Sequence, residues 1–135
     1  MEKEFITYGQ AVAIKELGFN GSCFAFYAIP NAEDKLFFDI DPDDGELTLL
    51  NQNQIYHNNL SEVGRISAPL KQQVFRWFRK IYYWTIKVNQ VTKNNWSYTL
   101  NNFPKDRTYY GEVYKTYEEA ESACIDKLIE IVKNR

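Results

Sequence analysis

The chain has few of the residues that build catalytic and metal sites. Histidine occurs once, at His57 in a polar stretch that is typical of a loop, and cysteine occurs twice, at Cys23 and Cys124. A single histidine with no nearby cysteine excludes the zinc-ligand spacings. The six glycines are scattered, which excludes a glycine-rich phosphate loop. No acid and base can be paired from the sequence, so we expect no enzymatic activity, no cofactor, and no catalytic or metal-binding residue.

Long apolar runs are also missing. The longest, Cys23 to Ile29, is far shorter than the roughly 20 residues that a membrane span needs. The first residues, Met1 to Phe5, lack the cationic and apolar regions of a secretory signal. We therefore expect a cytoplasmic protein without membrane contact. In that compartment the two cysteines are expected to be reduced and buried in the core, in preference to a disulfide.

The length and composition suit one domain. The chain has 135 residues, of which 44% are hydrophobic and 16% aromatic, enough for a single core. Charge divides this domain unevenly: residues 1–64 hold three basic and eleven acidic side chains, net −8, and residues 65–135 hold thirteen and seven, net +6. Either the acidic part (1–64) docks on the basic part (65–135), or the two present faces of opposite charge to partners.

The first half predicts a helix and a β-hairpin. A helix is expected from Tyr8 to Leu17, because Thr7 and Gln10 can form a capping box and Gly18 can end it in the left-handed conformation. Cys23 to Ile29 and Lys35 to Ile40 are expected to be antiparallel strands joined by a turn. A further turn and a short strand, Leu47 to Leu50, are expected before the weakly patterned residues 51–64.

The second half predicts a helix, three strands and a helix. The first helix is expected from Ala68 to Tyr82, starting at Ser67 and Pro69, with an apolar arc formed by Leu70, Val74, Trp77, Phe78 and Ile81. Alternating residues predict strands beginning at Trp84 and Trp96 and a third from Thr108 to Tyr114. The last helix is expected from Tyr117 to Lys133, with Thr116 and Glu119 forming a capping box. The predicted fold is α+β: an N-terminal helix and β-hairpin packed on a helix, three-stranded antiparallel meander, helix unit.

An acidic turn, Asp39 to Glu46, places five carboxylates within eight residues. A calcium loop needs glycine at its sixth position and glutamate at its twelfth. Counting from Asp39 or from Asp41 places neither residue correctly. We expect a solvated connection, and metal binding by this turn is the open alternative.

Nucleic-acid binding is one functional hypothesis. Residues 66–115 hold nine basic and two acidic side chains, net +7, with tryptophan and tyrosine between them, which suits phosphate contact and base stacking. The element order from Ala68 to Lys133 resembles the double-stranded-RNA-binding domain in outline. The chain departs from that family in its acidic Thr116 to Glu121, where the family has a lysine cluster, and in lacking the family's Gly-Pro-x-His loop.

Four blocks of sequence also resemble a family of small uncharacterised proteins encoded by phages and prophages of gut Bacteroidetes. The blocks are Thr7-Tyr8-Gly9-Gln10-Ala11, Lys15-Glu16-Leu17-Gly18-Phe19 leading to Cys23-Phe24, Ser67 to Gln73 with Phe75 to Arg79, and Thr116 to Ala120 with Cys124 and Lys127 to Ile131. The resemblance implies a phage setting and assigns no site, because the family's function is unknown.

The leading hypothesis is a non-enzymatic accessory protein that binds a protein partner or self-associates. Charge segregation and 22 aromatic residues motivate it, because aromatics are enriched in interface cores. The proposed contact surface consists of Arg76, Arg79, Lys80, Tyr110 and Tyr114. Nucleic-acid binding through residues 66–115 is the alternative, and no small-molecule substrate is apparent. Both hypotheses require that the basic side chains lie on an open surface.

Overall fold

A computed structural model describes residues 2–29, 32–38, 64–102, 105 and 107–134. The chain divides into two compact units, unit 1 (Met1–Leu70) and unit 2 (Lys71–Arg135), and each is described by itself. Helices and two antiparallel sheets occur in the described residues, which confirms the predicted α+β class. The acidic turn 39–46, the predicted strand 47–50 and His57 lie outside the described residues, and the single domain stays a prediction.

Unit 1 begins with a short 3₁₀ helix, Glu2–Glu4, followed by α1, Tyr8–Glu16. Both predicted ends of α1 are confirmed. Thr7 Oγ1 accepts a bond of 3.2 Å from the N–H of Gln10, whose side chain accepts one from the N–H of Thr7. Gly18 has φ of 103°, and the Phe19 N–H donates to the Ile14 carbonyl at 3.0 Å, as in a Schellman motif.

The unit 1 sheet has the order β2-β1-β3. Strands β1, Ala25–Ile29, and β2, Ala32–Phe38, form the predicted antiparallel pair. Strand β3, Gly64–Ala68, was not predicted, and it pairs with β1 on its other side. The predicted helix start at Ala68 is therefore wrong: Ser67 and Ala68 pair with Phe26 and Ala25, and the helix begins after Pro69.

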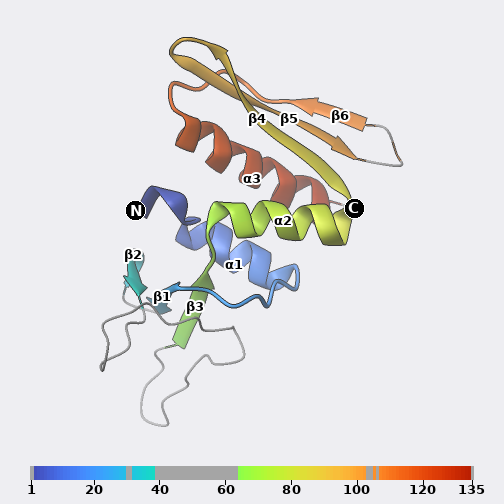
Figure 1. Ribbon diagram of the computed structural model, residues 1–135. Coiled ribbons are helices and arrows are strands. Elements are labelled where there is room, and N and C mark those ends of the chain that lie inside the picture. The colour runs from blue at the N-terminus through green and yellow to red at the C-terminus, as the bar shows by residue number, and fades with distance from the viewer. Residues whose placement is uncertain (1, 30–31, 39–63, 103–104, 106, 135) are drawn as a thin grey trace. The chain divides into compact units, whose positions relative to one another are not determined.

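Unit 2 contains the two remaining helices and the second sheet. Its elements are α2, Lys71–Tyr82, β4, Trp84–Thr92, β5, Asn95–Asn102, β6, Arg107–Tyr110, and α3, Tyr117–Lys133. The sheet has the order β4-β5-β6 with antiparallel pairs throughout, so the predicted meander is confirmed. A bridge between Trp96 and Tyr114 extends it beyond β6. Figure 1 shows α3 lying along one face of this sheet.

The two faces of this sheet differ in burial, as the alternating residues predicted. Trp84, Tyr98 and Leu100 are buried on the inner face. The residues between them lie on the outer face, where Thr85, Lys87 and Tyr110 are exposed. The inner face together with α2 and α3 therefore forms the core of unit 2.

The buried face of α2 is rotated relative to the predicted apolar arc. Lys71, Val74, Phe75 and Phe78 are buried, whereas Ile81 is 50% exposed. The prediction that Ile81 is a core residue was therefore wrong. Phe75 takes a core position instead, since residues 71, 74, 75 and 78 follow helical spacing on one side.

Helix α3 begins and ends where the sequence predicted. The hydroxyl of Thr116 accepts from the N–H of Glu119 at 3.1 Å, which is one of the two bonds of the predicted capping box. Cys124 is buried on α3, and Cys23 is buried in unit 1; both are free thiols, as expected. Burial raises the pKa of Cys23 to about 12 and raises that of Cys124 as well, so neither is a reactive thiolate.

Candidate nucleic-acid interface

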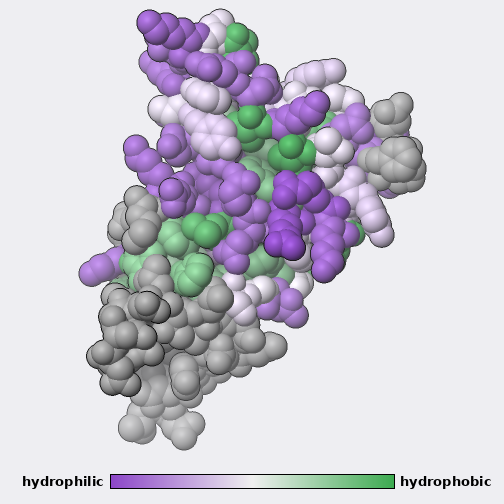
Figure 2. All heavy atoms as spheres, viewed as in Figure 1, coloured by the Kyte–Doolittle hydropathy of each residue, from purple (hydrophilic) through white to green (hydrophobic). Residues whose placement is uncertain are grey.

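The predicted contact surface comes from two separated parts of unit 2. Arg76, Arg79 and Lys80 are exposed on α2, and Figure 2 shows strongly hydrophilic side chains over the C-terminal half of this helix. Tyr110 is 79% exposed on β6. Tyr114 is half-buried, and its ring stacks on Tyr98 with centroids 6.3 Å apart.

The structure does not bring these five residues into one site. Helix α2 packs against α3 and β4, whereas β6 is at the opposite edge of the sheet. Tyr114 is held in the sheet by backbone bonds of 2.7 Å to Trp96. As a combined contact surface they stay a prediction.

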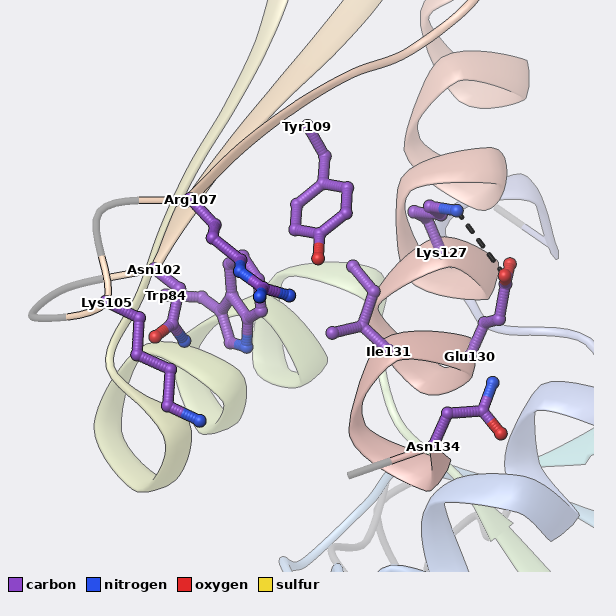
Figure 3. A pocket seen from close by; sticks show the side chains of 9 residues that line it. All are labelled: Trp84, Asn102, Lys105, Arg107, Tyr109, Lys127, Glu130, Ile131 and Asn134. Carbon is purple, nitrogen blue, oxygen red and sulfur yellow. Dashed lines mark hydrogen bonds and ion pairs between the residues drawn. The ribbon is translucent and has the colours of Figure 1, made fainter.

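A pocket of about 330 Å³ lies at one end of unit 2. Because the strands are antiparallel, β4 starts, β5 ends and β6 starts at this end, and α3 lies opposite with its C-terminal half. Figure 3 shows side chains from the sheet facing side chains from α3 across the hollow. The lining residues are Trp84, Asn102, Lys105, Arg107, Tyr109, Lys127, Glu130, Ile131 and Asn134.

Two aromatic rings form part of the pocket wall. The Trp84 and Tyr109 rings are tilted with centroids 5.9 Å apart. The Lys127 ammonium lies 5.7 Å from the centre of the Tyr109 ring, within the range of a cation–π contact. Lys127 Nζ is also 3.4 Å from Oε1 of Glu130. The wall therefore combines ring faces with a cation that has a carboxylate partner.

The charge around the pocket is positive. Lys105, Arg107 and Lys127 contribute three cations and Glu130 one anion among the lining residues. Lys105 and Arg107 are exposed and have no ion pair with any other residue that the structure describes. Arg79 and Lys80 lie in the last turn of α2, a few residues before Trp84. We call the pocket together with Arg79, Lys80 and Tyr83 the basic end of unit 2.

One polar atom of the pocket wall lacks a partner. The Trp84 side chain is 3% exposed, and its indole N–H has no hydrogen-bond acceptor among the described residues. The amide of the adjacent Asn102, in contrast, donates to the Tyr82 carbonyl at 3.2 Å. A buried donor without an acceptor costs free energy, so Trp84 marks a position where a ligand oxygen would be favourable.

Tyr83, between α2 and β4, has a strained backbone. Its φ is 61°, a conformation that is rare for a bulky residue. Its side chain is 68% exposed, and its N–H donates to the Arg79 carbonyl at 3.1 Å. Such strain is found disproportionately at functional sites, and here it occurs at an exposed ring on the residue that precedes Trp84 of the pocket wall.

The N-terminal turns of α3 have the opposite charge. Glu118, Glu119 and Glu121 lie there, and Glu121 is only 5% exposed. Burial raises the pKa of Glu121, although the nearby Lys71 opposes this effect. Burial likewise lowers the pKa of Lys71, opposed by Glu121 and Glu118. Unit 2 is therefore basic where α3 ends and acidic where it begins.

The sequence predictions missed the pocket. They described no small-molecule site; the proposed contact surface included Arg79 and Lys80 at this end of unit 2, and the basic segment 66–115 included Lys105 and Arg107 without placing them in a site. The alternation of apolar and polar residues in the sequence placed Trp84 on the inner face of the sheet. Antiparallel pairing of β4 with β5 and of β5 with β6 places Lys105 and Arg107 near Trp84. Those two signals together could have indicated the site.

Comparison of the chain with protein-family models, curated proteins and solved structures gives no match. Among the described residues, no helix is long and apolar enough to cross a membrane. In that same part of the chain, no cluster of three or more histidine, cysteine or acidic residues has metal-binding geometry.

Proposed function

We propose that this protein is a non-enzymatic accessory protein, encoded by a phage or prophage and acting in the cytoplasm, that binds nucleic acid through the basic end of unit 2. The observation that supports it most is the convergence of Lys105, Arg107 and Lys127 around a pocket with two aromatic rings. Cations bind phosphates, and the half-buried ring of Tyr109 offers a face on which a base can stack.

The charge distribution favours a single strand or a strand end over a duplex. The acidic first turns of α3 repel phosphate at the position where double-stranded-RNA-binding domains have lysines. The exposed ring of Tyr83 instead provides a stacking surface for an unpaired base, and Arg79 and Lys80 are suited to contact the backbone that follows it. The pocket is suited to binding and not to catalysis, because its one carboxylate, Glu130, is paired with Lys127.

Association with a protein, or between copies of this chain, is the second candidate. It is favoured by Tyr110 and Val113, which are 79% and 60% exposed and follow each other closely at the sheet edge. Light scattering measures this directly: a dimer that Tyr110→Ser converts to a monomer supports it, and a wild-type monomer at high concentration contradicts self-association.

Fluorescence anisotropy with a labelled single-stranded oligonucleotide tests the main proposal. Lys105→Ala/Arg107→Ala removes two cations from the pocket, and Lys87→Ala/Lys93→Ala removes two exposed cations from β4 and the β4–β5 turn. The pocket variant should bind about 100-fold more weakly than wild type, because each of the two lost charge-assisted contacts contributes about 1.5 kcal/mol at the low end of its range. The control should bind nearly as well as wild type.

Two results would overturn the proposal. One is the absence of binding by the wild-type protein at low salt, where electrostatic contacts are strongest. The other is equal weakening by both double variants, because nonspecific attraction depends on net charge and needs no pocket.

A further inference from the structure

The pocket geometry points to a more specific ligand. We infer that it binds one nucleotide that carries a phosphate monoester, either as the phosphorylated end of a strand or as a free nucleotide. This inference rests on the proposed function and deepens it, because it assigns the chemical group that the pocket recognises.

The charge of the pocket matches that group. Three cations and one carboxylate line it, a net charge of about +2. A phosphate monoester has a charge of about −1.5 to −2 at neutral pH, whereas each phosphate within a strand has one negative charge. Lys105 and Arg107 have exposed side chains without an ion-pair partner in the described chain, so both are available for a terminal phosphate. A guanidinium can also bind it through two parallel hydrogen bonds.

The remaining wall suits the nucleoside. Tyr109 and Ile131 offer ring and aliphatic surface, and Asn102 and Asn134 offer amide groups. The Trp84 indole N–H needs an acceptor, which a sugar, base or phosphate oxygen would supply. Its nitrogen is buried in this structure, so a ligand oxygen would reach it after a shift of a neighbouring side chain.

The size of the pocket limits how much of a strand can enter. Its volume of about 330 Å³ is at the lower end of the range for small-ligand pockets, roughly 300–1,000 Å³. One nucleotide is the unit that such a volume accommodates. The rest of a strand would then run outside, over Tyr83 and the last turn of α2.

Four ligands separate the possible sources of the phosphate. They are a short oligonucleotide with a 5′-phosphate, the same strand with a 3′-phosphate, the same strand with both ends as hydroxyls, and adenosine monophosphate, with adenosine as its control. At least one phosphorylated form should bind about tenfold tighter than its hydroxyl counterpart, the gain of one charge-assisted contact. Arg107→Ala should abolish this difference, whereas Lys87→Ala should preserve it.

A spectroscopic measurement locates the ligand. The chain has three tryptophans, so the ¹H–¹⁵N spectrum contains three indole N–H signals, and Trp84→Phe identifies one of them. Adenosine monophosphate or the phosphorylated strand should shift the Trp84 signal in wild-type protein. A saturating ligand that leaves all three indole signals unchanged overturns the placement in this pocket, independently of how Trp84→Phe folds.

The outcomes distinguish this inference from the proposed function. Equal binding of phosphorylated and hydroxyl strands, with no binding of adenosine monophosphate, overturns the inference and leaves nucleic-acid binding standing. Binding of adenosine monophosphate without binding of any strand supports the pocket assignment and contradicts nucleic-acid binding. Binding of none of the ligands overturns both.

Discussion

Gln72 in α2 donates a hydrogen bond of 2.9 Å from its side-chain Nε2 to Oε2 of Glu121 in α3. Lys71, the residue before it, donates from Nζ to the Glu118 carbonyl at 3.3 Å. These two bonds connect the first turns of the two helices. Lys71 and Glu121 are each only 5% exposed, so two groups of opposite charge are buried at the acidic end of unit 2, where the charge of each lowers the cost of burying the other.

Glu121→Gln tests the buried position of this carboxyl. Burial raises the folded-state pKa of Glu121 above its ordinary value of 4.5, while Lys71, Gln72 and Tyr117 act to lower it. The folded protein therefore holds this proton more tightly than the unfolded chain, and ionisation of Glu121 costs stability as pH rises through its folded-state pKa. The free energy of unfolding of the variant relative to wild type should thus increase as pH rises above 4.5, the ordinary pKa of a glutamate side chain.

Urea denaturation at several pH values measures this difference. Glu119→Gln is the matched control, because it removes an exposed charge from the same turn of α3. A relative stability of Glu121→Gln that does not change with pH contradicts the burial of Glu121. The comparison is then repeated with Lys71→Met introduced into both wild type and Glu121→Gln, which separates the contribution of the buried Lys71 ammonium.

Two glycine-to-alanine substitutions should have opposite effects on stability. A Cβ at Gly111 would lie 2.8 Å from Tyr98 Cζ and nearer still to two other ring atoms, and Tyr98 is buried on the inner sheet face. Gly111→Ala should therefore lower the free energy of unfolding by about 1–3 kcal/mol. Gly9 in α1 has nothing within 4 Å of its ideal Cβ, so Gly9→Ala should raise it by up to about 1 kcal/mol. Thermal or urea unfolding of the two variants checks both signs.

The helix ends and the order of the elements could be predicted from the sequence because their causes are local. Thr7, Gly18 and Thr116 act on backbone groups within a few residues of themselves. Strand β3 was missed because its partner, β1, lies about 40 residues earlier in the chain, and its five residues, Gly64–Ala68, have no distinctive alternation. Pairing at that separation is decided by tertiary contacts.

The candidate site was harder to predict for the same reason. Its lining comes from the start of β4, the β5–β6 connection and the end of α3. Individually, Trp84, Arg107 and Lys127 are ordinary residues of a sheet and a helix. Their proximity follows from strand register and from the direction in which α3 crosses the sheet, and neither is encoded in local spacing.

Substitutions of Tyr83 should separate stability from binding. Tyr83→Gly removes the penalty of a left-handed backbone and should raise the free energy of unfolding by about 1 kcal/mol. It also removes the exposed ring, so it should weaken oligonucleotide binding by about 1–3 kcal/mol, the usual contribution of one stacked base. Tyr83→Phe keeps the ring and should bind like wild type. Unfolding and anisotropy measurements on the same samples test both effects, and unchanged binding of Tyr83→Gly would exclude stacking at this position.

The salt dependence of strand binding tests the central claim most directly, because it counts the phosphate contacts that the basic end makes. For a single strand, the slope of log K against log[salt] is about −0.7 for each neutralised phosphate. If Lys105 and Arg107 together neutralise two phosphate charges, Lys105→Ala/Arg107→Ala should make the slope about 1.4 less negative than in wild type. The control Lys87→Ala/Lys93→Ala should keep the wild-type slope. Equal slopes in all three proteins would contradict phosphate binding by the basic end of unit 2.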